Sequence, residues 1–230
     1  LMSPEVRIQL FLKDGSSYLG ESFGLPASGG CAFSGEVVFN TSMVGYVESL
    51  TDPSYAGQIL VCTYPLIGNY GVPDEKYFES HKIQVAGLVV SQYSQMYSHH
   101  DAKHSLGEWL KKSGVPAMTG VDTRAITKKL REHGVMLGAL GQTAPKVFTD
   151  PNEENLVAKV SIKEKKEFGS GPIKIIAIDC GMKENIVRSL ARKEVTLVRV
   201  PWDYDFTKES YDALFISNGP GDPQSCVPTI

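Results

Sequence analysis

The fold is indicated most clearly by residues 173–202, which read IKIIAIDCGMKENIVRSLARKEVTLVRVPW. The run IKIIAID is almost continuously apolar, as expected for a parallel strand that is buried on both faces. The following segment places Ile186, Val187 and Leu190 on one side of a helix, and a second apolar run comes after it. A third run, SYDALFISN, follows a short connection. The order strand, helix, strand, connection, strand predicts an open α/β sheet.

The last of these strands leads into a bare turn, SNGPGDP, at residues 217–223. In open α/β sheets, ligands bind beyond the carboxyl ends of the strands. Gly219 and Gly221 permit positive φ angles and a close approach of backbone to ligand, and Pro220 between them stiffens the loop. Exposed backbone N–H groups in such a loop suit an anion or an oxyanion. A plain turn without a ligand is the alternative interpretation.

The first half of the chain is rich in short strands at close spacing. Asp14-Gly15 is a turn dipeptide between two strand-like runs and predicts a hairpin. Further strands are predicted in GEVVFNTS, GQILVCTYPLIG and IQVAGLVVSQY, with the turn-rich loop LTDPSYAG between the first two. Two helices interrupt them, SLGEWLKKSG and DTRAITKKLREHG. In the second, Asp122 or Thr123 can cap the first turn, and Gly134 suits the position after the last turn.

Residues 141–171 are polar and punctuated by proline and glycine, which predicts a linker. One short strand is predicted within it, in LVAKVSI, and the mixed charge run KEKKE is expected to be solvated.

The bulk composition limits the possible partners and compartments. A net charge of −3 and a pI of about 6.0 give no basis for nucleic-acid binding. The apolar runs are far shorter than the roughly 20 residues that cross a bilayer, so no membrane span is expected. Four cysteines lie far apart without a C-x-x-C pair, which favours reduced thiols: Cys31, Cys62, Cys180 and Cys226. No signal peptide is visible, and the location expected is cytoplasmic or mitochondrial.

Several stretches together resemble one family of class I glutamine amidotransferases. They are SNGPGDP, GEVVFNTSMVGYVESLTDPSYAGQILVCTYPLIGNYG, GVDTRAITKKLREHG and DCGMKENIVRSL. In this order they resemble the amidotransferase part of carbamoyl-phosphate synthetase, either the bacterial small subunit or the first portion of the fused eukaryotic enzymes. The resemblance implies an α/β chain in three parts. Residues 1–142 would form a β-rich small-subunit N-terminal domain of mixed β/α structure, residues 143–171 a linker, and residues 172–230 the first part of a flavodoxin-like amidotransferase domain.

The resemblance also implies a chemistry. Family members hydrolyse glutamine through a cysteine thioester and pass ammonia to a synthetase that uses bicarbonate and ATP. By motif, Ser54, Gly219 and Gly221 would bind glutamine, and the Gly219 N–H would be an oxyanion donor. Because Ser54 belongs to the β-rich half, a site between the two halves is expected. The expected partners are L-glutamine and a synthetase large subunit or fused synthetase domains. No cofactor is expected in this chain, since ATP and a divalent metal would belong to the synthetase.

The sequence departs from the family at the catalytic residues. The family's nucleophile lies in a G-x-C-x-G-H-Q elbow, which residues 1–230 do not contain. Neither Cys226 nor Cys180 stands in such an elbow, so no catalytic residue is assigned and the chain by itself is expected to be inactive, as the front part of a longer enzyme. An alternative is a non-catalytic scaffold or regulatory domain of an ammonia-dependent synthetase. A weaker alternative is a stand-alone flavodoxin-like binding module.

Three other features could suggest a site but have ordinary structural explanations. The stretch HHDAKH spaces His100 and His104 as zinc ligands on a helix are spaced, but it offers no third ligand, and no metal site is predicted. A basic surface on the second helix is expected to be solvated or to contact the synthetase: Arg124, Lys128, Lys129 and Arg131. The DCGMKEN loop lacks a dinucleotide fingerprint, and Lys183 and Asn185 in it are either structural or line a cleft.

Overall fold

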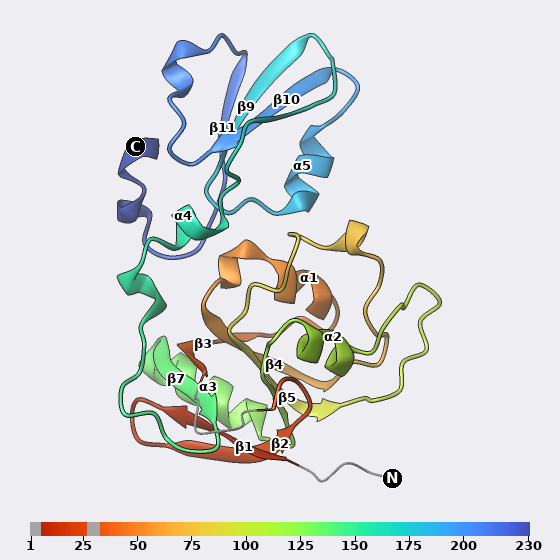
Figure 1. Ribbon diagram of the computed structural model, residues 1–230, viewed down its shortest axis with the longest axis vertical. Helices are drawn as coiled ribbons and strands as arrows, with labels where there is room; N and C mark the ends of the chain where they lie inside the picture. The colour runs from red at the N-terminus through yellow and green to blue at the C-terminus, as the bar shows by residue number, and fades with distance from the viewer. Residues whose placement is uncertain (1–5, 27–32) are drawn as a thin grey trace. The chain divides into compact units, whose positions relative to one another are not determined.

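The computed structural model describes residues 6–26 and 33–230, and it divides into two compact units (Figure 1). The first unit comprises Leu1–Thr51 and Gly57–Pro151, and the second comprises Asp52–Ala56 and Asn152–Ile230. The short segment Asp52–Ala56 therefore groups with the second unit, although the chain on either side of it belongs to the first. Cys31 lies outside the described residues.

The first unit is built on a closed barrel with the strand order β1-β2-β6-β5-β4-β3-β7. The β3–β4, β4–β5 and β5–β6 pairs are parallel, and the other pairs are antiparallel. The predicted β-rich domain of mixed β/α structure is confirmed. The strands are β1 Arg7–Leu12, β2 Ser17–Ser22, β3 Phe33–Asn40, β4 Gln58–Ile67, β5 Gly87–Tyr93, β6 Ala117–Thr119 and β7 Met136–Gly141.

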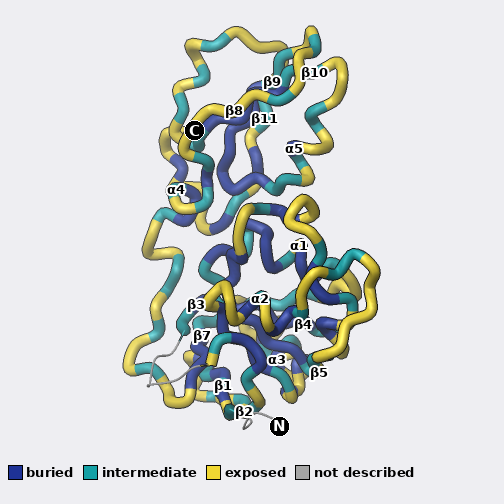
Figure 2. Tube along the Cα trace, turned by 45° about the vertical axis from the view of Figure 1, so that its right-hand side comes forward, coloured by how far each residue is buried: buried dark blue, intermediate teal, exposed yellow. Residues whose placement is uncertain are grey.

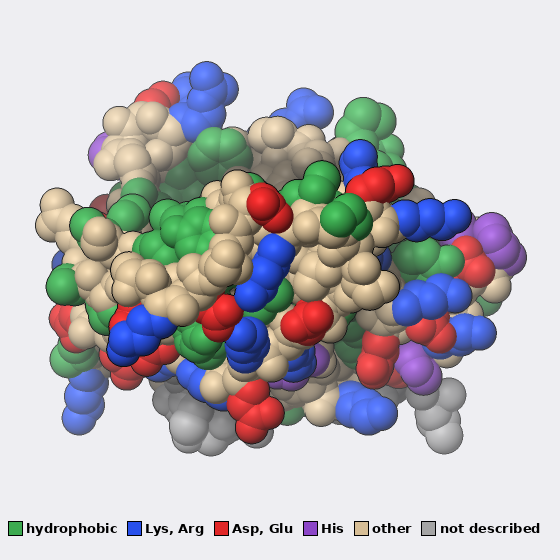
Figure 3. All heavy atoms as spheres, turned by 90° about the horizontal axis from the view of Figure 1, so that it is seen from above, with side chains coloured by type: hydrophobic (Ala, Val, Ile, Leu, Met, Phe, Trp, Pro, Cys, Tyr) green, Lys and Arg blue, Asp and Glu red, His purple; other side chains and the backbone are tan. Residues whose placement is uncertain are grey.

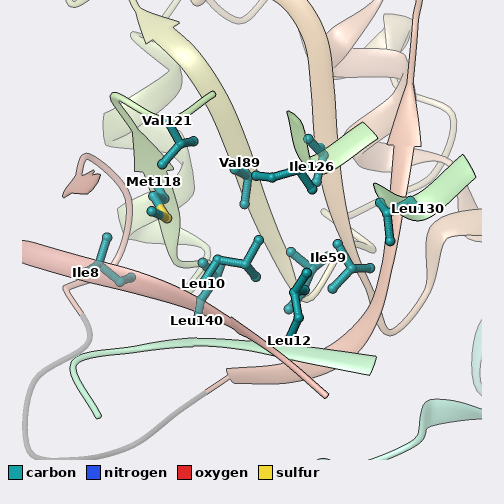
Figure 4. Packing of buried hydrophobic residues seen from close by; sticks show 12 residues of the cluster. Ile8, Leu10, Leu12, Ile59, Val89, Met118, Val121, Ile126, Leu130 and Leu140 are labelled. Carbon is teal, nitrogen blue, oxygen red and sulfur yellow. The ribbon is translucent and has the colours of Figure 1, made fainter. Parts of the chain in front are cut away.

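The barrel core follows from the alternation of side chains along its strands. In β1, Ile8, Leu10 and Leu12 point inward and are at most 1% exposed, while their neighbours face outward. Figure 4 shows these side chains converging with apolar side chains from β4, β5 and β7 and from helix α3. Each fully buried aliphatic side chain contributes about 1.5–3 kcal/mol relative to an exposed one.

In the described part of the first unit, three α-helices accompany the barrel: α1 Tyr46–Thr51, α2 Leu106–Lys112 and α3 Thr123–His133. Both predicted helices form. Ser105 and Glu108 make a reciprocal capping box at the start of α2. Asp122 accepts hydrogen bonds from two backbone N–H groups of α3, and Gly134 follows that helix at φ 80°. The predictions missed α1, whose six residues are too few for a clear helical periodicity.

The second unit contains a four-stranded sheet of order β11-β9-β10-β8. The strands β9, β10 and β11 are parallel, and β8 pairs antiparallel with β10. This confirms the predicted order of strands and helix. The elements are α4 Leu156–Val160, β8 Lys166–Phe168, β9 Ile173–Asp179, α5 Glu184–Leu190, β10 Val195–Pro201 and β11 Ala213–Ile216.

The region predicted to be a linker contains helix α4 and strand β8, besides a short 3₁₀ helix at Pro151–Glu153. The strand predicted in LVAKVSI is wrong, because Leu156–Val160 form helix α4. Asn155 accounts for this, since its side chain accepts a hydrogen bond from Ala158 N (2.9 Å) and caps the first turn. The charge run at residues 163–167 is exposed as predicted, and its end joins the sheet edge as β8.

Both faces of β9 are covered. Ile176, Ala177 and Ile178 are fully buried, and they belong to two apolar clusters on opposite faces of the sheet. Figure 2 shows the Cα trace coloured by burial, with buried residues in dark blue within this sheet. Lys and Arg side chains are interspersed with Asp and Glu side chains on the face shown in Figure 3. Among the described residues, no helix is long and apolar enough to cross a membrane.

Candidate functional site

The candidate site lies at the carboxyl ends of β9 and β11 in the second unit. In the parallel pair, Ile216 is in register with Ile178, so the loops after the two strands leave the sheet side by side. The loop after β11 is the predicted glycine turn, and the loop after β9 begins at Cys180. The site is therefore at the edge where open α/β sheets bind ligands.

The two loops are in direct backbone contact. A Cβ atom at Gly219 would lie 1.7 Å from the Cys180 carbonyl oxygen, so this position accepts only glycine. Gly181 has φ 117°, and a Cβ there would lie 2.9 Å from Pro220 Cδ. Gly221 has φ 75°, a backbone conformation that residues other than glycine rarely adopt. The shape of the turn thus requires glycine at 219 and favours it at 221.

A serine hydroxyl ties the loops together. Ser217 Oγ accepts a hydrogen bond from Cys180 N (2.9 Å) and donates one to the Asn218 carbonyl (2.8 Å). Within the described part of the chain, the backbone N–H groups of Gly219 and Gly221 donate to no protein acceptor. Gly219 is half-buried and Gly221 is exposed. The turn therefore presents two unused donors from a fixed backbone.

The structure brings Ser54 to this turn. Ser54 Oγ accepts a hydrogen bond from Asn218 Nδ2 at 2.8 Å, and Asn218 directly precedes Gly219. The segment that carries Ser54 groups with the second unit, so Ser54 and the two glycines belong to one unit. The expectation had assigned Ser54 to the β-rich half of the chain.

Asp52 and Lys183 hold Ser54 in place. Ser54 lies in the short 3₁₀ helix Pro53–Tyr55, and Asp52 Oδ1 accepts the Ser54 N–H at 2.9 Å. Asp52 is 5% exposed, and its second oxygen pairs with Lys183 Nζ at 2.8 Å. Lys183 comes from the loop after β9. An aspartate capping side chain before proline is a recognisable cap signal, and it is how Asp52 could have been found from sequence.

Sequence reasoning missed Asp52 and Asn218 and left Lys183 unassigned. Asn218 gave no signal beyond its place next to the glycines.

The described cysteines are not activated thiols. Cys62, Cys180 and Cys226 are free and buried. Burial raises the pKa of Cys62 to about 12 and that of Cys180 to about 11, and it also raises the pKa of Cys226. A nucleophilic cysteine needs a lowered pKa, so these three thiols are protonated and poorly reactive at neutral pH.

The histidine stretch does not form the helical pair that its spacing suggested. Helix α2 begins only at Leu106, after His104. Instead His99, His100 and Asp101 place one ligand atom each within 4.8 Å of one another on an exposed loop. His100 Nε2 lies 3.2 Å from Asp101 Oδ2, a contact that an ordinary surface ion pair explains.

The first unit contains a separate hollow of about 560 Å³. Its walls come from the loop around Phe78 and from helix α2 with Trp109, and the two rings lie 5.0 Å apart. None of the predicted site residues lines it. The volume of a hollow is therefore a poor guide to the site here, and the convergence of backbone donors on one turn is the better one.

Comparisons with known proteins match both parts of the chain. The family model described as "Carbamoyl-phosphate synthase small chain, CPSase domain" matches residues 10–140, and "Glutamine amidotransferase class-I" matches residues 176–230. The chain is 50% identical over 260 residues to the multifunctional protein URA2 of Saccharomyces cerevisiae, covering 94% of this chain and 12% of that protein. It is 52% identical over 236 residues to the multifunctional protein CAD of Squalus acanthias, covering 96% and 10%.

A third relative carries a different name. The chain is 48% identical over 233 residues to the carbamoyl-phosphate synthase (ammonia), mitochondrial, of Aquarana catesbeiana, covering 96% of this chain and 15% of that protein. The chain thus spans 10 to 15% of the length of these three relatives.

Proposed function

Because this chain belongs to the carbamoyl-phosphate synthase small-chain family, we propose that it forms the glutamine-binding part of a glutamine-dependent carbamoyl-phosphate synthase. The observation that carries the proposal is the hydrogen bond between Ser54 and Asn218, which joins the serine loop to the glycine turn. A ligand at this point meets a hydroxyl and two unused backbone N–H groups. These are groups that a polar amide such as glutamine can engage.

The proposed chemistry assigns a separate task to each group. Ser54 and the Gly221 N–H hold glutamine, and the Gly219 N–H faces the amide oxygen that becomes negative when a thiolate attacks the adjacent carbon. Losing one such donor typically lowers the rate about 10²–10³-fold. The donor needs no reorganisation, because the contact between Gly219 and Cys180 already fixes its direction.

The attacking thiolate is not proposed to come from the three described cysteines, which are buried and protonated. Residues 1–230 contain no cysteine in the family's elbow motif. The polypeptide of 230 residues is therefore proposed to contribute to glutamine binding without hydrolysing glutamine by itself. The ammonia would pass to a synthetase partner or to fused synthetase domains, which would use the ATP and the divalent metal.

The names of the relatives support a fused architecture and one compartment. Two of them are named multifunctional proteins, and a third is named mitochondrial. A mitochondrial setting is proposed on this basis, with a cytoplasmic setting as the alternative.

A second function is favoured by the relative that is named for ammonia. In an ammonia-dependent synthase the same domain would be a non-catalytic scaffold or regulatory domain. Carbamoyl phosphate synthesis by the full-length protein, measured with glutamine and then with ammonium chloride as nitrogen donor, separates the two. Synthesis with both donors supports the glutamine-dependent enzyme, and synthesis with ammonium alone supports the scaffold.

Replacing Gly221 by Val tests the site itself. The branched side chain disfavours the positive φ and fills the exposed side of the turn, so glutamine-dependent synthesis is expected to be lost while ammonium-dependent synthesis continues. Unchanged glutaminase kinetics in this variant would remove Gly221 from the binding site.

A further inference from the structure

A fully buried carboxylate lies directly beneath the two site loops. Asp179 is the last residue of β9 and is 0% exposed. Its Oδ1 accepts hydrogen bonds from the backbone N–H groups of Gly181 (2.8 Å) and Met182 (2.7 Å). This one oxygen therefore fixes the course of the chain as it leaves the sheet.

The second carboxylate oxygen is held by an arginine from the neighbouring strand. Asp179 Oδ2 accepts from Arg199 Nε at 2.9 Å, lies 2.8 Å from Arg199 Nη2, and also accepts from Ile162 N at 3.0 Å. Arg199 is 6% exposed, so the two charges neutralise each other out of contact with solvent. A buried carboxylate that lost this partner would be left as an uncompensated charge.

Arg199 also contacts the end of the same loop that leads into α5. Its Nη1 lies 2.6 Å from Glu184 Oε1 at the start of α5, and its Nη2 donates to the Met182 carbonyl at 3.3 Å. The guanidinium thus reaches the residue before the loop, a carbonyl within it and the first residue after it. Only a planar fork with several donors can do this, and a lysine ammonium cannot.

The loop held in this way forms one wall of the glycine turn. The Cys180 carbonyl lies where a Cβ of Gly219 would be, and the Cys180 N–H donates to Ser217 Oγ. Gly181 packs against Pro220. Displacing residues 180–182 by even a fraction of an ångström would move the backbone of Gly219.

We propose that Asp179 and Arg199 are positioning residues that set the direction of the Gly219 N–H through the loop after β9. They do not touch the substrate. The inference rests on the proposed function only in what the turn binds, because the mechanical coupling of the two loops follows from the contacts alone. The DCGMK stretch therefore fixes the backbone position of the glycine turn through these contacts.

The coupling is tested by amide hydrogen exchange on the full-length protein carrying Asp179→Asn or Arg199→Lys. Asp179→Asn keeps the shape of the side chain and removes its charge, and Arg199→Lys keeps the charge and removes the planar fork of donors. Exchange is expected to become about tenfold faster or more both in residues 180–183 and at Ser217, whose N–H donates to the Ile178 carbonyl, as the loss of a charged hydrogen bond implies. Asp212→Asn is the matched control, because that carboxylate accepts the Lys174 N–H at the opposite end of the strands. It should leave both loops unchanged.

Faster exchange in residues 180–183 alone, or in neither loop, overturns the inference. Arg199→Lys carries the test if Asp179→Asn fails to fold.

Kinetics then separate the inference from the proposed function. With Arg199→Lys, the kcat for glutamine-dependent synthesis is expected to fall about tenfold or more with little change in the KM for glutamine, while ammonium-dependent synthesis keeps its rate. An unchanged kcat with glutamine overturns the inference. Coupled exchange in a protein whose unaltered form does not use glutamine instead supports the positioning contact and refutes the proposed function.

Discussion

The two units bury their sheets in different ways. The seven strands of the first unit close on themselves, so every strand has two neighbours and the side chains inside the barrel are sealed from water. The four strands of the second unit form an open sheet whose outer strands, among the described residues, are β11 and β8. Ile216 on β11 is 51% exposed. Closing the barrel pairs every strand and so stabilises the first unit. In the second unit, the turn that follows β11 leaves backbone donors available to a ligand.

The largest effect is expected from opening a cavity in the barrel. Leu10→Ala removes a side chain that is 0% exposed, and the first unit should lose about 2–5 kcal/mol in free energy of unfolding. Leu19→Ala on the neighbouring strand, where the side chain is 49% exposed, should cost less than about 0.5 kcal/mol. Denaturant unfolding followed by tryptophan fluorescence measures both.

The two tryptophans make the comparison specific to each unit. Trp109 lies in the first unit and Trp202 in the second, so replacing either one by Phe leaves a probe for the other. Leu10→Ala should shift the Trp109 transition and leave the Trp202 transition in place. Equal shifts of both transitions would show that the two units unfold together.

In the second unit, the free energy of unfolding should depend strongly on which glycine of the turn receives an added methyl group. Gly219→Ala forces a Cβ against the Cys180 carbonyl, and overpacking of this kind should cost about 3 kcal/mol in free energy of unfolding. Gly221→Ala meets Leu156 only at an ordinary contact distance of 3.5 Å, so its cost comes from the positive φ and is about 1 kcal/mol. The Trp202 transition measures the difference, and equal costs at the two positions would contradict the tight contact.

Acid should weaken each unit through a different ion pair. In the second unit, Lys165, with Tyr204 and Lys174, lowers the pKa of Glu209 from 4.5 to about 2. Because the folded pKa is the lower one, this stabilisation is complete above about pH 4.5 and is lost as the pH falls towards 2. Glu209→Gln should flatten the acid limb of the Trp202 transition.

The barrel provides the comparison for the acid experiment. There a hydrogen bond from Lys129 and, as a smaller contribution, one from Ser16 hold the pKa of Asp14 below its usual range. The acid limb of the Trp109 transition should respond to Asp14→Asn and not to Glu209→Gln. A response of the barrel to Glu209→Gln would mean that the two ion pairs are linked.

The smallest change in stability is expected at the open edge. Ile216→Lys places a charge on the exposed side of β11 and should alter the free energy of unfolding by less than about 0.5 kcal/mol. Light scattering of the 230-residue polypeptide should nevertheless show less self-association, because a lysine discourages edge-to-edge pairing of strands. Unchanged scattering would mean that another surface drives association.

Local patterns explain how much of the fold could be predicted. The β9–α5–β10 order was predictable because a buried parallel strand and its crossover helix have continuous, local signatures. The closure of the barrel could not be predicted. It depends on β6, which has only three residues, and on the pairing of β1 with β7, which lie far apart in the sequence. Helix α4 was mistaken for a strand because its apolar residues are β-prone, and the Asn155 cap outweighed them.

The candidate site was predictable only where one residue type was indispensable. Gly219 and Gly221 could be found because the backbone geometry excludes other residues at 219 and, through a positive φ, favours glycine at 221. Asn218 could not, because its partner Ser54 lies 164 residues away along the chain. Asp179 and Arg199 look like ordinary strand residues in the sequence, and their pairing depends on the register between β9 and β10. Long-range polar partners of this kind are visible only after the chain has folded.

The contact between Gly219 and the Cys180 carbonyl also has a consequence at the level of the gene. Since a hydrogen atom is the largest substituent that fits, codon 219 can change only in its silent third base. A saturation library selected for a working protein should return almost nothing else there. Codon 221 should admit a few asparagine or aspartate clones, because those residues tolerate a left-handed backbone and a Cβ there meets its nearest atom, in Leu156, at an ordinary 3.5 Å.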